Sequence, residues 1–260
     1  MLYPRTIPCL LLKNKGLVKT INFKKPKYVG DPINAVRIFN EKEVDELIVL
    51  DIDATVENTG PDYKTIEHLA AECRMPFCYG GGIKTVEQAE NIIGLGVEKV
   101  AISSGAIENP KLITLIAERI GNQSIVVVLD IKKNRSGDKY EVRTHNGSKN
   151  TGKDPSELAF QMQKLGAGEI VINSIDNDGK MKGYDLAIID KIRKSTSVQL
   201  TILGGAGSLH DIGQVIDNYG VIGAAAGSLF VFKGIYRAVL INYPNRAEKD
   251  ALIEENFHVN

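Results

Sequence analysis

Phe77-Cys78-Tyr79-Gly80-Gly81-Gly82-Ile83 and Ile202-Leu203-Gly204-Gly205-Ala206-Gly207 are two glycine-rich stretches with the same surroundings. Each follows a short apolar run and precedes a helical pattern, at 84–94 and 208–217, and each is followed by an apolar run ending in small and hydroxyl residues. A glycine turn before a helix lets backbone N–H groups approach an anion closely. The pair therefore predicts two phosphate pockets, the alternative being that the glycines only form tight turns.

Short apolar runs alternate with amphipathic stretches along the whole chain. Near-continuous apolar strands separated by helices indicate a parallel sheet buried on both faces, and eight such units predict an α/β fold of the (β/α)8 TIM barrel type. An open doubly wound sheet is the alternative, but its glycine loop occurs once, after the first strand. The expected strands are 6–12, 46–51, 76–79, 99–103, 125–130, 169–173, 199–203 and 221–225, and the expected helices are 32–43, 62–73, 84–94, 109–120, 154–165, 184–194, 208–217 and 233–242.

The repeat is broader than the glycine loops. Residues 1–125 and 126–260 each contain four strand–helix units, and no linker rich in Pro, Gly or Ser separates them. We therefore expect one domain over 1–260, a barrel built from two similar half-barrels. Long stretches at 13–23 and 131–151 interrupt the alternation, the second predicting a small hairpin, and the charged tail 244–260 is expected outside the barrel.

The composition of the 260 residues is that of an ordinary soluble protein, 43% hydrophobic and 25% charged. Acidic and basic residues balance at 32 each, which argues against a nucleic acid or an anionic membrane as partner. We expect a cytoplasmic protein, because no signal-peptide pattern or long apolar run occurs. Cys9, Cys73 and Cys78 lack metal-type spacing and are expected to be reduced and buried, so neither a metal nor a cofactor is predicted.

Acidic residues follow several of the expected strands, at positions that would face the mouth of a barrel. They are Asp51, Asp130, Asp176 and Asp178. Asp130 directly follows the apolar run 125–129, where low-dielectric walls would raise its pKa and suit it to general acid or base catalysis. A solvated strand-end aspartate that caps the next loop is the alternative for each of them.

At these residues the sequence resembles the HisF family, the cyclase subunits of imidazole glycerol phosphate synthase. The resemblance covers nearly the whole chain. It is carried by Ile7-Pro8-Cys9-Leu10, Lys19, Asn22-Phe23, Gly30-Asp31-Pro32, Asp45-Glu46-Leu47, Leu50-Asp51-Ile52, Tyr79-Gly80-Gly81-Gly82-Ile83, Glu108-Asn109-Pro110, Asp130, Lys149-Asn150-Thr151-Gly152, Gly166-Ala167-Gly168-Glu169, Ser174-Ile175-Asp176, Asp178-Gly179, Gly183-Tyr184-Asp185 and Gly204-Gly205-Ala206-Gly207.

The resemblance implies a barrel that binds a phosphorylated small molecule and works with a glutaminase (HisH-like) subunit, from which ammonia crosses the barrel interior to the mouth. The first implied phosphate site comprises Gly82, Ser103 and Ser104, and the second Asp178, Gly179, Gly205, Gly227 and Ser228, with Lys19 in the substrate loop. Four charged residues, Arg5, Glu46, Lys99 and Glu169, match a ring that guards ammonia entry in the family. A purely structural salt-bridge ring is the alternative.

One departure matters for the chemistry. The family closes its ring with two mouth aspartates, and Asp130 matches the second, but Leu11 occupies the first position. Leucine cannot transfer a proton, and loss of a positioned acid or base typically costs about 10²–10⁴ in rate. Asn173 also stands where the family usually has threonine, whereas Asp176 is kept and could support Asp130.

Three hypotheses follow. In the first, the barrel receives ammonia for amidination of a nucleotide-linked sugar in surface-polysaccharide synthesis, with a possible separate sugar amidotransferase, as the resemblance to a paralogous branch with Leu11 implies. In the second, Asp130 and Asp176 suffice for imidazole glycerol phosphate synthase activity in histidine biosynthesis. In the third, a silent barrel only activates a glutaminase by docking. Whether the chain is itself an enzyme stays open at this point.

Overall fold

Eight parallel strands close into a barrel in the computed structural model, which describes residues 3–134, 136–137 and 139–257. Each strand pairs with the next in sequence order, and the last pairs with the first, so the predicted (β/α)8 architecture is confirmed. The barrel strands are β1 (Arg5–Lys13), β4 (Leu47–Asp51), β5 (Phe77–Gly80), β6 (Lys99–Ile102), β7 (Ile125–Lys133), β10 (Glu169–Ser174), β11 (Gln199–Leu203) and β12 (Gly223–Ala226).

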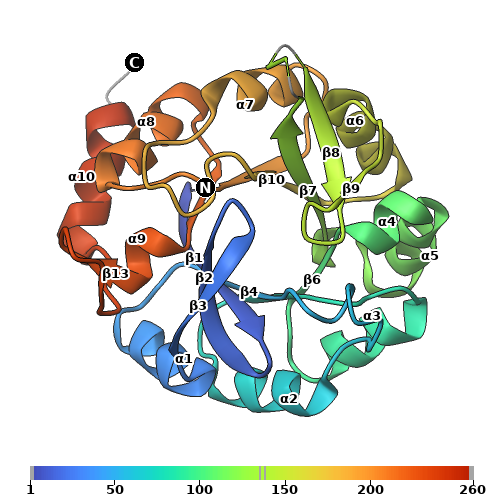
Figure 1. Ribbon diagram of the computed structural model, residues 1–260, viewed down its shortest axis with the longest axis horizontal. Coiled ribbons are helices and arrows are strands. Elements are labelled where there is room, and N and C mark those ends of the chain that lie inside the picture. Colours follow the sequence, from blue (N-terminus) through green and yellow to red (C-terminus); the bar gives the residue numbers. More distant parts are fainter. Residues whose placement is uncertain (1–2, 135, 138, 258–260) are drawn as a thin grey trace.

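Helices form an outer ring around this barrel (Figure 1). They are α1 (Pro32–Glu41), α2 (Tyr63–Glu72), α3 (Val86–Gly94), α4 (Ser104–Glu108), α5 (Lys111–Ile120), α6 (Pro155–Leu165), α7 (Leu186–Arg193), α8 (Leu209–Tyr219), α9 (Ser228–Val231) and α10 (Arg246–Phe257), with a 3₁₀ turn at Asn122–Ser124. Their apolar faces and the outward side chains of the strands form the main core, which includes Phe39, Ile66 and Ile113. Within the described residues, no helix is long and apolar enough to cross a membrane.

Matching caps fix the helices that follow the two glycine loops. The Thr85 hydroxyl accepts a hydrogen bond from the backbone N–H of Gln88, and Ser208 does the same for Asp211 at the start of α8. In both cases the third helical residue bonds back to the cap, which makes a reciprocal capping box. The two loops therefore lead into their helices by the same local device, as their sequence likeness predicts.

Two antiparallel hairpins are added to the barrel at the carboxyl ends of its strands. β2 (Gly16–Ile21) pairs with β1 and with β3 (Lys24–Gly30), and this hairpin crosses the barrel opening in Figure 1. β8 (Tyr140–Thr144) pairs with β7 and with β9 (Lys149–Asn150), which confirms the hairpin predicted within 131–151. The stretch 13–23, expected as a loop, instead forms strands because its turn residues Asn14 and Lys15 adopt positive φ, as a tight hairpin requires.

The expected helix at 233–242 is wrong. This segment contains β13 (Phe232–Lys233) and β14 (Ala238–Val239), which pair as an antiparallel hairpin around Gly234 at φ +71°. Its apolar residues, with Ile235 and Tyr236 almost fully exposed, have no helix-side core to pack against. The outer ring is completed instead by α10, so the expectation that 244–260 lies outside the barrel is also wrong for its described part: α10 lies beside α8 (Figure 1), where Leu252 reaches Gly213.

Candidate functional site at the barrel mouth

A single cavity at the carboxyl ends of the strands brings together most of the predicted site residues. Its lining includes Leu11, Lys19, Gly82, Ser103, Ser104, Asp130, Asp178, Gly179, Gly205, Gly227 and Ser228. Asp176 is not among the lining residues, because its carboxylate accepts a hydrogen bond from the backbone N–H of Lys133 at 2.8 Å. The structure therefore gives Asp176 a role in fixing the end of β7 rather than a place in the cavity.

Asp130 is the acid of this cavity. The sequence suggested that Asp130 ends its strand. In the structure, β7 continues past Asp130 to Lys133 and pairs with β8, so Asp130 lies within the strand. Burial raises the pKa of the Asp130 carboxyl to about 7, the nearby Asp178 adds to that rise, and a hydrogen bond donated by Asn173 Nδ2 at 2.8 Å opposes it. A carboxyl that titrates near neutral pH can donate or accept a proton under physiological conditions.

Leu11 brings no such chemistry. It pairs with Val18 of β2 and Leu50 of β4, and its half-buried side chain joins the apolar barrel interior with Leu50. Asp51, another strand-end candidate, lines the cavity but accepts hydrogen bonds from the backbone N–H groups of Asp53 and Ala54, so it caps its own loop. Of the three aspartates that line the cavity, Asp51 is therefore occupied by its own turn, and Asp130 and Asp178 are not.

The first glycine loop lies against the Ser103–Ser104 turn. A Cβ on Gly105 would come 2.3 Å from the carbonyl oxygen of Ile83, so the two segments touch backbone to backbone. Ser104 is the first residue of α4, and the buried hydroxyl of Ser103 lies close enough to the Asp130 carboxyl to help lower its pKa, against the larger effect of burial. Gly82, Ser103 and Ser104 thus lie together around one end of the cavity.

The second glycine loop lines the cavity together with Gly227 and Ser228 at the start of α9, and it packs against the 181–183 segment. Gly205 adopts φ +123°, and its Cβ would lie 2.1 Å from the carbonyl oxygen of Gly183. Gly179, at φ +68°, passes equally close to Thr20 in the β2–β3 hairpin. The Asp178 carboxylate accepts hydrogen bonds from the Thr20 hydroxyl at 2.7 Å and the Phe23 backbone N–H at 3.0 Å. Asp178 therefore holds the hairpin over the cavity, and burial raises its pKa.

The tip of the β8–β9 hairpin contributes residues that the sequence analysis did not select. His145 and Asn146 line the cavity, and Asn146 Nδ2 donates to the carbonyl oxygen of Ile52 at 2.6 Å. The backbone N–H of His145 points to the Ser104 hydroxyl, 3.4 Å away. Both residues have φ +53°, and the following Gly147 has φ +74°. The sequence His145-Asn146-Gly147 carried a tight-turn signature, but nothing local to it showed that the turn reaches back to the mouth.

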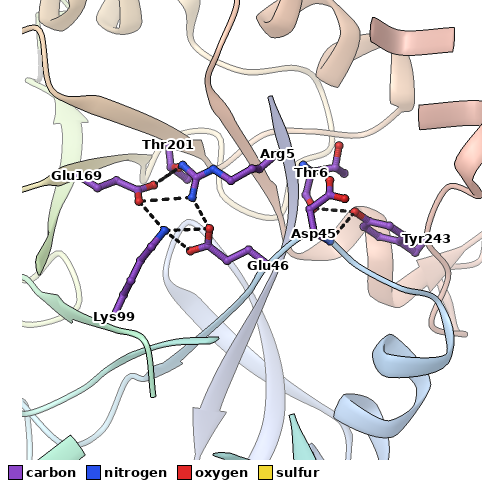
Figure 2. Close-up of polar contacts among 8 residues, drawn as sticks. All are labelled: Arg5, Thr6, Asp45, Glu46, Lys99, Glu169, Thr201 and Tyr243. Atoms are coloured by element: carbon purple, nitrogen blue, oxygen red, sulfur yellow. Dashed lines mark hydrogen bonds and ion pairs between the residues drawn. The ribbon is translucent and has the colours of Figure 1, made fainter. Parts of the chain in front are cut away.

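At the opposite end of the barrel, four charged side chains form a closed ring (Figure 2). Arg5 pairs with Glu46 and, at 2.8 Å, with Glu169, while Lys99 pairs with Glu46 and Glu169, both at 2.9 Å. Burial opposes ionisation of Glu169, but Arg5 and Lys99 outweigh it and lower the pKa of this carboxyl. Burial likewise opposes the charge on Lys99, and the two glutamates outweigh it, so the pKa of the amine is raised.

A second polar cluster braces the strands that carry this ring. The Tyr243 hydroxyl donates to the carbonyl oxygen of Thr6 at 2.8 Å, and the Thr6 backbone N–H donates to Asp45 at 2.8 Å (Figure 2). Lys249 of α10 pairs with the same Asp45 at 2.7 Å. Thr6 and Asp45 are the chain neighbours of Arg5 and Glu46, so the C-terminal segment fixes the two strands that present one side of the ring.

Between the ring and the mouth, the barrel interior is apolar and contains several small side chains. It comprises Ile7, Cys9, Ile48, Cys78, Ala101, Val126, Val128, Val171, Leu203 and Ala225, with Leu11 and Leu50 packed at its edge. Cys9 and Cys78 are free and buried here, as expected, whereas Cys73 is only half-buried. Among the described residues, the charged side chains lie at the two ends of this interior, so a polar solute crosses it most cheaply when it is small and uncharged.

Comparison with known proteins agrees with this architecture. The family model described as histidine biosynthesis protein matches residues 5–236. A Vibrio vulnificus protein provisionally named imidazole glycerol phosphate synthase subunit hisF3 is 59% identical over 254 residues, covering 98% of both chains. The Natranaerobius thermophilus imidazole glycerol phosphate synthase subunit HisF is 38% identical over 243 residues, covering 94% of this chain and 96% of its own. The chain therefore belongs to the histidine biosynthesis protein family, as a HisF-type barrel.

Proposed function

We infer that this chain is the barrel subunit of a glutamine amidotransferase complex, which receives ammonia from a glutaminase subunit and delivers it to a phosphorylated acceptor at the barrel mouth. The observation that carries this function is the apolar barrel interior lying between the Arg5–Glu46–Lys99–Glu169 ring and the Asp130 cavity. The charged ring at one end could contact a docking partner. At the other end, Asp130 and the glycine turns could contact a ligand.

The chemistry of the interior suits ammonia. Neutral NH₃ crosses an apolar space far more cheaply than NH₄⁺, because burying an unpaired charge costs many kcal/mol. The ring side chains must move apart to let ammonia pass. Lys99 is suited to such a movement, because its charged amine is carried on a flexible chain and its side chain is 19% exposed. We propose that partner docking at this face draws the Lys99 amine away from the two glutamates and opens the floor.

The mouth suits an acceptor with two anionic groups. Gly82 with Ser103 and Ser104 forms one end of the cavity, and Gly205 with Gly227 and Ser228 forms the other. Backbone N–H groups at glycine turns and helix starts are ready anion ligands. The matching arrangement of the two ends supports the proposal that they arose from two similar half-barrels, 1–125 and 126–260.

Leu11 favours an acceptor whose reaction needs no second acid. With Asp130 as the mouth acid and leucine across the cavity, we propose amidination of a nucleotide-linked sugar in surface-polysaccharide synthesis, in which a separate amidotransferase would complete the transfer. The relatives at 52–59% identity carry provisional names, two of them numbered hisF2 and hisF3, whereas those at 36–40% are named HisF without qualification. This separation supports a distinct branch.

Imidazole glycerol phosphate synthase activity is the second candidate, and the names of the relatives support it more directly than they support the polysaccharide role. It requires Asp130 to close the imidazole ring without an acid at position 11. The cyclase assay that ends the Discussion separates the two candidates.

Ammonia receipt is tested with the glutaminase subunit from the same host. We expect Lys99→Glu, which places a third acid in the ring, to weaken glutaminase binding or to abolish its stimulation by the barrel. Lys64→Glu, the same change at an exposed site on α2, is the matched control. Unchanged binding and unchanged ammonia transfer by a folded Lys99→Glu protein would show that the ring is only structural.

A further inference from the structure

Lys19 is a buried amine without a counter-charge. Its side chain lies on β2, the residue is 6% exposed, and its Nζ donates to the carbonyl oxygen of Cys9 at 2.6 Å. Among the residues that the structure describes, no carboxylate lies within 4.0 Å of this nitrogen, whereas Lys13 pairs with Asp53 and Lys99 with two glutamates. Buried lysines are uncommon unless paired, so this one calls for a functional explanation.

The amine lies at the second glycine end of the mouth cavity. A Cβ on Gly227 would come 2.6 Å from Lys19 Nζ, so the amine lies directly against the backbone at the start of α9. Lys19 follows Val18, the residue that pairs with Leu11, and both Lys19 and Leu11 line the cavity.

Burial lowers the pKa of Lys19, while the Cys9 thiol on β1 and Asp178 in the loop after β10 act in the opposite direction. A lowered pKa leaves more of the amine neutral near pH 7, and the neutral form is the nucleophile. Desolvated lysines of this kind form Schiff bases with carbonyl compounds.

We propose that Lys19 captures the carbonyl group of a phosphorylated aldehyde or ketone as an imine, with the phosphate held at the glycine turns of the mouth. The neutral Nζ attacks the carbonyl carbon, and the adduct then loses the former carbonyl oxygen as water, so that a C=N bond replaces the C=O bond. No oxidant or reductant is consumed, and hydrolysis reverses the step.

The cavity also holds a group able to assist the loss of water. Asp130 lines the same cavity, and its pKa of about 7 leaves a protonated fraction at neutral pH. A protonated carboxyl can give its proton to the departing hydroxyl, and the carboxylate can take it back when the imine is hydrolysed. This inference does not depend on ammonia transfer, because it concerns the isolated barrel.

The test is reductive trapping on the barrel alone. The protein is incubated near pH 7 with D-glyceraldehyde 3-phosphate and cyanoborohydride, which reduces an imine to a stable secondary amine, and modified lysines are located by peptide mass spectrometry. We expect Lys19 to be modified faster than exposed lysines such as Lys24 and Lys25, because its lowered pKa leaves more of its amine in the neutral, nucleophilic form. Lys19→Arg should lose the fast phase, and Lys25→Arg should keep it.

Glyceraldehyde without the phosphate is the matched probe. It should label Lys19 more slowly than glyceraldehyde 3-phosphate does, and added pyrophosphate should slow labelling by the phosphorylated probe only. Modification spread over surface lysines with Lys19 left intact would overturn the proposal. Equal rates with the two aldehydes would overturn the assignment of a phosphorylated ligand. Because these readouts need neither glutamine nor an acceptor, they stand or fall separately from the amidotransferase function.

Discussion

Asn173 and Asp130 face each other across paired strands, and the Asn173 Nδ2 donates to the Asp130 Oδ1 at 2.8 Å. The strand register sets this contact, because β10 and β7 pair these two residues directly. The bond favours the charged carboxylate, but burial outweighs it and leaves the pKa of Asp130 at about 7. The pKa of Asp130 is thus partly set by Asn173, its direct neighbour on the adjacent strand.

Asp130→Asn should change how stability depends on pH. Because the pKa of Asp130 is raised on folding, its stabilising contribution is complete below the unfolded pKa and is lost as pH rises through about 7. Between about pH 4 and pH 8, the wild type should lose about 2–4 kcal/mol of unfolding free energy relative to Asp130→Asn. Urea unfolding at both pH values measures this. Asp217→Asn, an exposed charge removal on α8, is the control, and parallel curves for wild type and Asp130→Asn would contradict the raised pKa.

Gly179→Ala should damage the mouth, whereas Gly220→Ala should not. The two glycines have nearly the same φ, +68° and +67°, but a Cβ on Gly179 would lie 2.0 Å from the carbonyl oxygen of Thr20, and one on Gly220 would meet nothing within 4 Å. Both variants carry the strain of a positive φ, and Gly220→Ala carries no less of it, because the ψ of −120° at Gly220 lies outside the left-handed helical region. Only Gly179→Ala must also displace the β2–β3 hairpin, so pyrophosphate binding, measured by calorimetry, should weaken in that variant alone. Equal binding by both would show that the hairpin position does not matter.

Glu169→Gln should destabilise the barrel strongly. Its carboxylate is 6% exposed and faces both Arg5 and Lys99, so the neutral amide leaves two half-buried cations sharing Glu46. Removing one partner of a buried ion pair costs about 3–5 kcal/mol. Thermal and urea unfolding should show this loss, whereas Glu118→Gln on the exposed face of α5 should change stability little. A loss no larger than that of the control would mean that the ring contributes no net stabilisation.

Tyr243→Phe tests the brace between the C-terminal segment and the ring strands. The change removes the hydroxyl that donates to Thr6 and accepts from the Asp45 backbone N–H at 3.3 Å. We expect a loss of about 1–3 kcal/mol, because the hydroxyl's buried hydrogen bonds to Thr6 and Asp45 are removed. Tyr236→Phe, at a residue 89% exposed, should have almost no effect in the same unfolding experiment. Equal losses of unfolding free energy in the two variants would show that the Tyr243 hydroxyl does not stabilise the ring strands.

The sequence predicted the barrel because its information is local and repeated. Runs such as 125–129 are apolar on both sheet faces, and the capped helices after Gly82 and Gly205 repeat one signal. The sequence failed at 233–242, where an apolar composition resembles a helix but Gly234 and a missing core favour a hairpin. It also failed at α10. This helix has a charged sequence, but it packs on α8 where Leu252 lies against Gly213, and that contact cannot be seen in the local sequence.

The site residues near the carboxyl ends of the barrel strands could be predicted from the sequence. Those that reach the cavity from long loops through tertiary contacts could not. Asp130 and Ser103 follow from the rule that barrel strands present their carboxyl ends at one mouth. His145 and Asn146 reach the cavity through a hairpin whose direction is set by the tertiary contact to Ile52, which no local pattern encodes. Asp176 looked equivalent to Asp178, but the contact to Lys133 turns it away.

Cyclase activity measured on the wild type beside Leu11→Asp tests the central claim most directly. Both proteins are supplied with the substrate of the HisF cyclase reaction and saturating ammonium at elevated pH, where NH₃ is abundant. The account predicts that the wild type turns over at least about 10²-fold more slowly than Leu11→Asp, the usual effect of a missing positioned acid. Turnover by the wild type equal to that of Leu11→Asp would contradict the account and assign the chain to imidazole glycerol phosphate synthesis.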